Sequence, residues 1–246
     1  MNSLKNKIIV VTGGNGMLGK EIISKILLAG GFCVNVDISH ATSADLSTLK
    51  CDITNPIEVE DSIKLIIEKY ARIDGLVNNA YPRTSDWGLK FEHIPYSSWQ
   101  KNVDSQMNSY FHFSQQVSKY MVANRAGSIV NIASVYGVVG PDFGVYDGTE
   151  MTMPAAYSAI KGGIINFSRY LASYLGPQNV RVNVVSPGGI FDNQNPIFVE
   201  NYNKKVPMRR MGNPEDISPA VVFLLSDDTK YLTGQNIIVD GGWTAI

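Results

Sequence analysis

A tyrosine and a lysine four residues apart, Tyr157 and Lys161, could together transfer a proton. They lie in a segment with helical periodicity, in which residues i and i+4 share one face. A phenol with an ordinary pKa of about 10 is a poor base at neutral pH, and a neighbouring ammonium favours its charged form. Ser134 follows a predicted strand and could place a second hydroxyl at the same site. The pair alone is weak evidence, because an exposed lysine beside a half-buried tyrosine is common on surface helices.

A glycine-rich turn between the first predicted strand and the first predicted helix could hold phosphate. Glycine there permits a tight turn, a close approach of the backbone to a pyrophosphate, and close packing of the helix on the strand. The free amides and the positive end of the helix then attract the phosphate charge. An ordinary glycine turn is the alternative, but the strand before it and the helix after it favour a dinucleotide site. The residues expected to contact the cofactor here are Gly13, Asn15, Gly16, Met17, Leu18 and Gly19.

An acidic residue at the end of the second predicted strand, Asp37, indicates which dinucleotide binds. A carboxylate at this place accepts hydrogen bonds from the adenine-ribose hydroxyls and repels a 2′-phosphate. The next three residues, up to His40, include no arginine or lysine, so NAD is predicted rather than NADP. A purely structural turn aspartate is the alternative interpretation. Asp52 and Ile53 follow the next short strand and could approach the adenine, although Asp52 could equally serve only as a helix-entry residue.

These residues belong to short apolar strands that alternate with longer helical segments. The strands are apolar almost throughout, as expected for strands covered on both faces. Such alternation, with right-handed crossovers, predicts an α/β fold with one Rossmann-type, doubly wound parallel sheet flanked by helices. Residues 1–246 contain no linker or repeat and are expected to form a single domain. The predicted strands are 7–12, 32–37, 73–77, 128–133, 180–185 and 237–239, and the predicted helices are 17–30, 56–70, 96–124, 155–175 and 214–226.

The composition excludes several classes of protein. Hydrophobic residues make up 44% of the 246 residues and charged residues 17%, which excludes a disordered chain. A net charge of −1 provides no basic excess for binding nucleic acid or an anionic membrane. No apolar run approaches the roughly 18 residues that span a bilayer, and no separate signal segment precedes the first strand. With two cysteines and three scattered histidines, we expect a cytoplasmic protein without disulfides or a metal site.

Taken together, these motifs resemble those of the short-chain dehydrogenase/reductase family, over essentially the whole chain. The resemblance implies that Tyr157 is the general acid or base, and that Lys161 lowers its pKa and binds the nicotinamide ribose. It also implies that Ser134 orients the substrate oxygen. The expected assembly is a homotetramer, or a homodimer, formed through the two long central helices and the C-terminal segment. Further cofactor contacts implied by the resemblance are Asn78, Asn79, Ala80, Pro187, Gly188 and Ile190.

The sequence departs from the family pattern at four places. Met17 stands where the common short glycine loop has its second glycine. Gln106 stands where the family usually has an active-site asparagine, so the water relay to the lysine is either rebuilt through Gln106 or partly lost. The catalytic serine and tyrosine are 23 positions apart instead of about a dozen, so residues 140–154 are expected to form a loop over the substrate mouth. Tyr81 replaces the glycine of an Asn-Asn-Ala-Gly motif and should place a bulky ring beside the site.

The substrate is expected to be a sugar or nucleotide-sugar. Residues 140–154 and the C-terminal residues 239–246 resemble the dehydrogenases of flagellin modification and surface-glycan synthesis. Two irregular segments, 140–154 and 189–206, contain amides and hydroxyls that could pair with sugar hydroxyls, although a plain flexible loop is an equal alternative. The amides in question are Asn193, Gln194 and Asn195, and the cations that could receive a phosphate are Lys204, Lys205 and Arg209.

Two other functions remain open from the sequence. One is a sugar epimerase or dehydratase that retains its NAD, which the extended glycine loop allows. The other is a regulator that senses NAD without chemistry. The presence of both Tyr157 and Lys161 weighs against the regulator.

Overall fold

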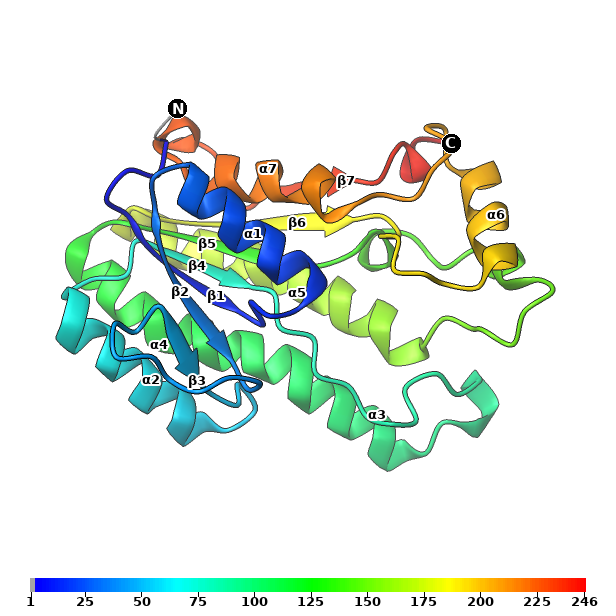
Figure 1. Cartoon of the computed structure of the whole chain (residues 1–246), viewed down its shortest axis with the longest axis horizontal. Helices are drawn as coiled ribbons and strands as arrows, with labels where there is room; N and C mark the ends of the chain where they lie inside the picture. Colours follow the sequence, from blue (N-terminus) through cyan, green and yellow to red (C-terminus); the bar gives the residue numbers. More distant parts are fainter. Residues whose placement is uncertain (1–2) are drawn as a thin grey trace.

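The computed structural model describes residues 3–246, and its centre is a seven-stranded sheet between two layers of helices (Figure 1). The strand order is β3-β2-β1-β4-β5-β6-β7, and every neighbouring pair is parallel. This confirms the predicted doubly wound sheet. The strands are β1 (Ile8–Thr12), β2 (Phe32–Asp37), β3 (Thr48–Lys50), β4 (Gly75–Asn78), β5 (Gly127–Ile132), β6 (Val180–Pro187) and β7 (Asn236–Val239).

Helices cover both faces of the sheet. On one face lie α1 (Met17–Leu28) and α7 (Pro214–Leu225), which pack against each other. On the other face lie α2 (Pro56–Tyr70), α4 (Ser109–Asn124) and α5 (Ala155–Leu175). Each layer encloses its own apolar core against the strands. The central strands are therefore buried on both sides, which explains their nearly continuous apolar sequences.

The helix boundaries follow local sequence signals. Asn55 precedes α2 and its side chain accepts a hydrogen bond from the amide of Ile57. At α7, Asn213 and Asp216 form a reciprocal capping box, with a proline at the first helical position. Such caps satisfy amides that the helix itself leaves without partners.

Two elements differ from the prediction. The helix predicted over 96–124 is α3 (Tyr96–Val103) and α4 joined by a π-helical turn at Asp104–Asn108. Residues 189–206, predicted to be irregular, contain a ten-residue helix, α6 (Pro196–Lys205). Asn195 caps it, Pro196 starts it, and Phe198 and Tyr202 bury one face four residues apart. The prediction of an irregular segment was wrong there.

Within residues 3–246, no helix combines the length and the apolar character that crossing a membrane would require. Cys33 and Cys51 are both buried and free. Burial raises the pKa of the Cys51 thiol to about 11, so it stays protonated at neutral pH.

Candidate active site

A cleft of about 750 Å³ lies beyond the carboxyl ends of the strands. Its walls come from the turn after β1 and from the residues that follow β2, β3, β4, β5 and β6, with the first turns of α5 on one side. Open parallel sheets bind their ligands at this edge. In Figure 1, α3 and α6 extend past the same end of the sheet.

The glycine turn at one end of the cleft is shaped for a backbone-bound ligand. Gly13 has φ +66°, and a Cβ added there would lie 2.7 Å from the Cα of Ala80. A Cβ at Gly19 would collide with the carbonyl of Gly13, so this glycine permits the tight turn rather than lining the cleft. Gly16 precedes helix α1 and has no side chain to cap it, which leaves the first amides of the helix free for a phosphate. These features fit the pyrophosphate of a dinucleotide.

Asp37 lines the same end of the cleft and is held in place by its neighbours. Its carboxylate accepts hydrogen bonds from the amide of Asn15 at 3.0 Å, and from the amide and hydroxyl of Ser39 at 2.9 and 2.6 Å. Partial burial raises the pKa of Asp37, but these hydrogen bonds outweigh that effect and the pKa is lowered. A fixed negative charge therefore faces the place where an adenine ribose would lie.

The structure brings Ser134, Tyr157 and Lys161 together at the other end of the cleft. Ser134 follows β5, while Tyr157 and Lys161 occupy one face of α5. The Lys161 ammonium is buried and donates to the carbonyl of Ile132 at 2.9 Å. It also lies 5.6 Å from the ring centres of Tyr157, Tyr81 and Tyr110. Three tyrosine rings thus surround one ammonium, and each attracts it through its electron-rich face.

Burial shifts the pKa values of Lys161 and Tyr157 in opposite directions. It lowers the pKa of Lys161 to about 7, because the charged form loses its hydration. Burial also raises the pKa of Tyr157, which the Ser134 hydroxyl partly offsets. At neutral pH the phenol is therefore protonated and can donate its proton.

An aromatic wall stands beside the catalytic tyrosine. The ring of Tyr81 meets that of Tyr157 edge to face at 5.6 Å, and Trp87 meets both at 5.8 and 6.3 Å. The expectation that the tyrosine in place of the motif's glycine would put a ring beside the site agrees with this geometry. Other lining residues that sequence analysis did not single out are Arg83, Tyr136, Met153 and Asp192.

Four of the expected site residues do not line the cleft: Asn15, Gly19, Asn78 and Gln106. The Asn78 amide is buried and donates to Ser114 and Asn131, so it ties β4 to α4 and β5. Gln106 is also buried, in the π-helical turn, and within residues 3–246 neither polar atom of its amide has a hydrogen-bond partner. Its part in a water relay stays a prediction. The remaining expected residues line the cleft: Gly13, Gly16, Met17, Leu18, Asp37, Asp52, Ile53, Asn79, Ala80, Ser134, Tyr157, Lys161, Pro187, Gly188 and Ile190.

The loop at 140–154 packs against helix α6 beside the catalytic end of the cleft. Tyr146 stacks on Phe198 at 5.2 Å, and Asp142 forms an ion pair with Lys205 at 2.7 Å. Met153 and Pro154 from the loop line the cleft. We call this pair of segments, 140–154 and α6, the lid.

The polar residues expected to contact substrate have other partners. Asn195 caps α6 and, like Asn193, does not line the cleft. Gln194 does line it, but its side chain bonds the carbonyl of Ile190 and the amide of Asp192. The expected phosphate-binding lysines are also paired within the lid, Lys204 with Glu200 and Lys205 with Asp142.

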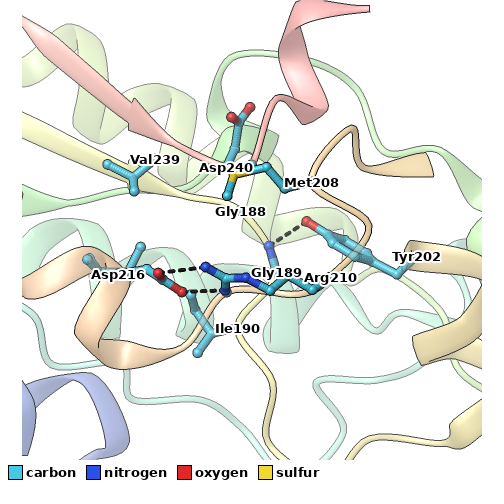
Figure 2. A pocket seen from close by; sticks show the side chains of 12 residues that line it. Gly188, Gly189, Ile190, Tyr202, Met208, Arg210, Asp216, Val239 and Asp240 are labelled. Carbon is cyan, nitrogen blue, oxygen red and sulfur yellow. Dashed lines mark hydrogen bonds and ion pairs between the residues drawn. The ribbon is translucent and has the colours of Figure 1, made fainter. Parts of the chain in front are cut away.

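A second, smaller pocket of about 130 Å³ lies behind the lid and shares Gly188, Gly189 and Ile190 with the cleft. Figure 2 shows its two fixed contacts. Arg210 donates two hydrogen bonds, of 2.6 and 2.8 Å, to the carboxylate of Asp216. The Tyr202 hydroxyl accepts a hydrogen bond from the Gly189 amide at 2.6 Å. The guanidinium lowers the pKa of Asp216 to about 2. The Tyr202 contact holds Gly189, which follows β6, against α6, and the Arg210 contact fixes the segment that precedes α7.

Comparison with known proteins agrees with this architecture. A family model described as enoyl-(acyl carrier protein) reductase matches residues 35–244. A solved short-chain dehydrogenase from Leptospira borgpetersenii, with bound NAD+, is 34% identical, with a TM-score of 0.88 over 98% of this chain and 94% of that one.

Two curated relatives match along almost their whole length. The post-translational flagellin modification protein A of Campylobacter coli is 36% identical over 98% of this chain and 99% of its own. The 7alpha-hydroxysteroid dehydrogenase of Bacteroides fragilis is 30% identical over 99% of this chain and 96% of its own. With the glycine turn, the cleft and the serine, tyrosine and lysine in place, the chain belongs to the short-chain dehydrogenase/reductase family and is an oxidoreductase.

Proposed function

We propose that this protein is an NAD-dependent dehydrogenase that interconverts a hydroxyl and a carbonyl group on a sugar or nucleotide-sugar. The observation that carries the proposal is the shared cleft. One end presents the glycine turn and Asp37, and the other presents Ser134, Tyr157 and Lys161. A cofactor and a substrate can therefore meet within one cleft.

NAD fits the cofactor end. The free amides at the start of α1 would hold the pyrophosphate, and the Asp37 carboxylate would accept bonds from the ribose hydroxyls. A 2′-phosphate would face that negative charge, and no arginine or lysine within the next three residues compensates it. When bound, NAD would accept or supply the hydride. The similar Leptospira dehydrogenase was solved with NAD+, which supports this choice of cofactor.

The proton is handled by Tyr157. Because its phenol is protonated at neutral pH, its Oη can donate to a carbonyl oxygen during reduction. The Ser134 hydroxyl lies at the same end of the cleft and can orient that oxygen. In the oxidising direction Tyr157 must accept the proton instead, and a charged Lys161 favours the phenolate.

The substrate class is supported by the walls of the cleft and by one relative. The catalytic end combines an aromatic wall with charged side chains, Arg83 and Asp192, and is not uniformly apolar. A steroid or acyl chain would leave such charges desolvated and without partners. The similarity to a flagellin modification protein supports a role in surface-glycan chemistry.

The test is turnover followed by absorbance at 340 nm, with NAD and NADP in parallel. The panel contains hexoses, hexosamines, their phosphates and nucleotide-sugars, together with steroid and long-chain alcohols. We expect reduction of NAD with a sugar derivative. Reduction with steroid or long-chain alcohols alone, equal rates with NADP, or sugar conversion without net reduction would contradict the proposal.

Tyr157→Phe should lower turnover about 10²–10⁴-fold, because general acid–base groups contribute that much, and should leave NADH affinity nearly unchanged. Tyr231→Phe is the matched control, since that ring is fully exposed. If the Tyr157→Phe enzyme kept most of its activity, the proton would have to come from another group.

A further inference from the structure

Arg83 is a cation in the cleft that neither the fold nor the expected cofactor contacts use. Among the lining residues the cations are Arg83 and Lys161, and Lys161 is buried against a carbonyl and three rings. Arg83 is exposed at the wall of the cleft. Within residues 3–246 its guanidinium forms no ion pair and no hydrogen bond with a protein acceptor.

The guanidinium is nevertheless held in position. It lies 5.7 Å from the centre of the Tyr81 ring, and that ring packs edge to face on both Tyr157 and Trp87. Stacking on a ring that is itself packed restricts an arginine without using its five N–H donors. Arg83 is therefore separated from the catalytic tyrosine by a single aromatic ring, with its donors free.

The other candidate cations of this region differ from Arg83. Lys204 and Lys205 are paired with Glu200 and Asp142, and Arg210 is committed to Asp216. Arg209, the third cation expected to receive a phosphate, donates to the carbonyl of Lys204. None of these four cations lines the cleft. A negatively charged ligand in the catalytic end would thus meet Arg83 as the cation whose donors are available.

We propose that Arg83 is a specificity-determining residue that binds a phosphate group of the sugar substrate, while the Tyr81 ring borders the sugar ring. The inference rests on the proposed function and narrows it to phosphorylated sugars, either sugar phosphates or nucleotide-sugars. Guanidinium matches phosphate with two parallel N–H bonds, and an uncompensated arginine beside the reacting group favours an anion there. The cofactor pyrophosphate has its own place at the glycine turn, where the α1 amides are free.

The test measures binding to protein saturated with NAD+, so that it does not depend on turnover. Glucose, glucose 1-phosphate, glucose 6-phosphate and UDP-glucose are titrated calorimetrically into the wild type, Arg83→Gln and Arg83→Lys. We expect at least one phosphorylated probe to bind more tightly than glucose. Arg83→Gln should weaken that probe about 10- to 100-fold, as expected for a lost charged hydrogen bond, and Arg83→Lys should restore part of the affinity. Added salt should reduce the wild-type advantage.

The control is Arg125→Gln, which removes an exposed arginine at the turn between α4 and β5. It should leave every affinity unchanged. Weaker NADH binding by Arg83→Gln, with sugar affinities unchanged, would assign Arg83 to the cofactor and overturn the inference. Equal binding of glucose and all phosphorylated probes would overturn it as well.

The proposed function is judged separately by turnover of the panel. If neutral sugars are oxidised as efficiently as their phosphates and Arg83→Gln changes neither rate, the dehydrogenase assignment stands and the phosphate inference fails. If no sugar is oxidised or bound, both fail.

Discussion

Lys161 shows how one buried residue couples chemistry to stability. Its ammonium has one hydrogen-bond acceptor, the carbonyl of Ile132, and otherwise faces aromatic rings. Burial lowers its pKa to about 7, far below the value of about 10.4 in an unfolded chain. At neutral pH the unfolded chain therefore binds more protons at this position than the folded protein does.

This difference in bound protons decides how the stability of the folded protein changes with pH. Below pH 7 the folded protein carries the buried charge at its full cost, and above about 10.4 neither state is protonated. The destabilisation should therefore be greatest at or below pH 7 and disappear as the pH rises to about 10.4. We predict that Lys161→Met without cofactor melts several degrees above the wild type at pH 7, and that the gap closes by pH 10. Thermal unfolding of both proteins from pH 6 to 10 measures this difference in melting temperature. The control Lys64→Met removes an exposed lysine and should show no such trend; a gap that grows with pH would contradict the prediction.

At the scale of elements, the lid is held by packing more than by charge. Phe198 on α6 is only 7% exposed, stacks on Tyr146 and packs at a tilt against Tyr202. The Asp142–Lys205 ion pair is about 40% exposed on each side and is expected to contribute less than about 1 kcal/mol. Removing a buried phenylalanine ring typically costs about 3–5 kcal/mol.

We therefore predict that Phe198→Ala opens the lid locally. Amide exchange in α6 and in residues 140–154 should accelerate much more than in β4 and β5, and KM for substrate should rise while NADH affinity stays nearly constant. Hydrogen exchange followed by mass spectrometry measures this, with Asp142→Asn as the comparison that changes exchange little. Equal exchange in Phe198→Ala and the wild type would show that the stacked rings do not hold the lid.

The elements also show what the sequence could predict. The bounds of β2, α2 and α5 were predicted to the residue, because apolar runs and helical periodicity with proline or asparagine at the ends define them. Helix α6 was missed since its few buried residues lie among polar ones, although Asn195 and Pro196 are start signals. The π-helical turn depends on backbone hydrogen bonding that no residue pattern specifies.

The site was predictable where a residue type has a definite chemical task. Tyr157, Lys161 and Asp37 lie in the cleft as expected. Burial shifts the pKa of the first two, and hydrogen bonds lower the pKa of Asp37. Asn193 and Asn195 appeared to be substrate ligands only because an amide in a loop looks the same whether it caps a helix or binds a ligand. Arg83 was missed for the converse reason, since an exposed arginine in a loop ordinarily indicates nothing more than solvation.

At the scale of the whole molecule, several exposed aromatic side chains lie on the outer faces of the two central helices, α4 and α5. On α5, Tyr170 and Tyr174 are stacked nearly parallel and are 62% and 69% exposed. On α4, Phe111 is 47% exposed and packs against Phe167 of α5. Exposed aromatic side chains gathered in this way are typical of interfaces, where they become the residues that contribute most of the binding energy.

We predict that the 27.0 kDa chain assembles into a homotetramer, or a homodimer, through this α4–α5 face. Two copies related by a two-fold axis would bury the same aromatic residues from each side. Phe111→Asp with Tyr174→Asp should shift the mass measured by light scattering after gel filtration towards a smaller assembly, because each carboxylate would lose its hydration in the interface. The control Lys64→Asp changes charge at an exposed residue of α2, outside the α4–α5 face, and should leave the mass unchanged. The glycine turn and Asp37, which are expected to hold the cofactor, belong to the same chain, so the dissociated protein should still bind NADH. A wild-type mass of 27 kDa, or an unchanged mass in the double variant, would contradict the predicted interface.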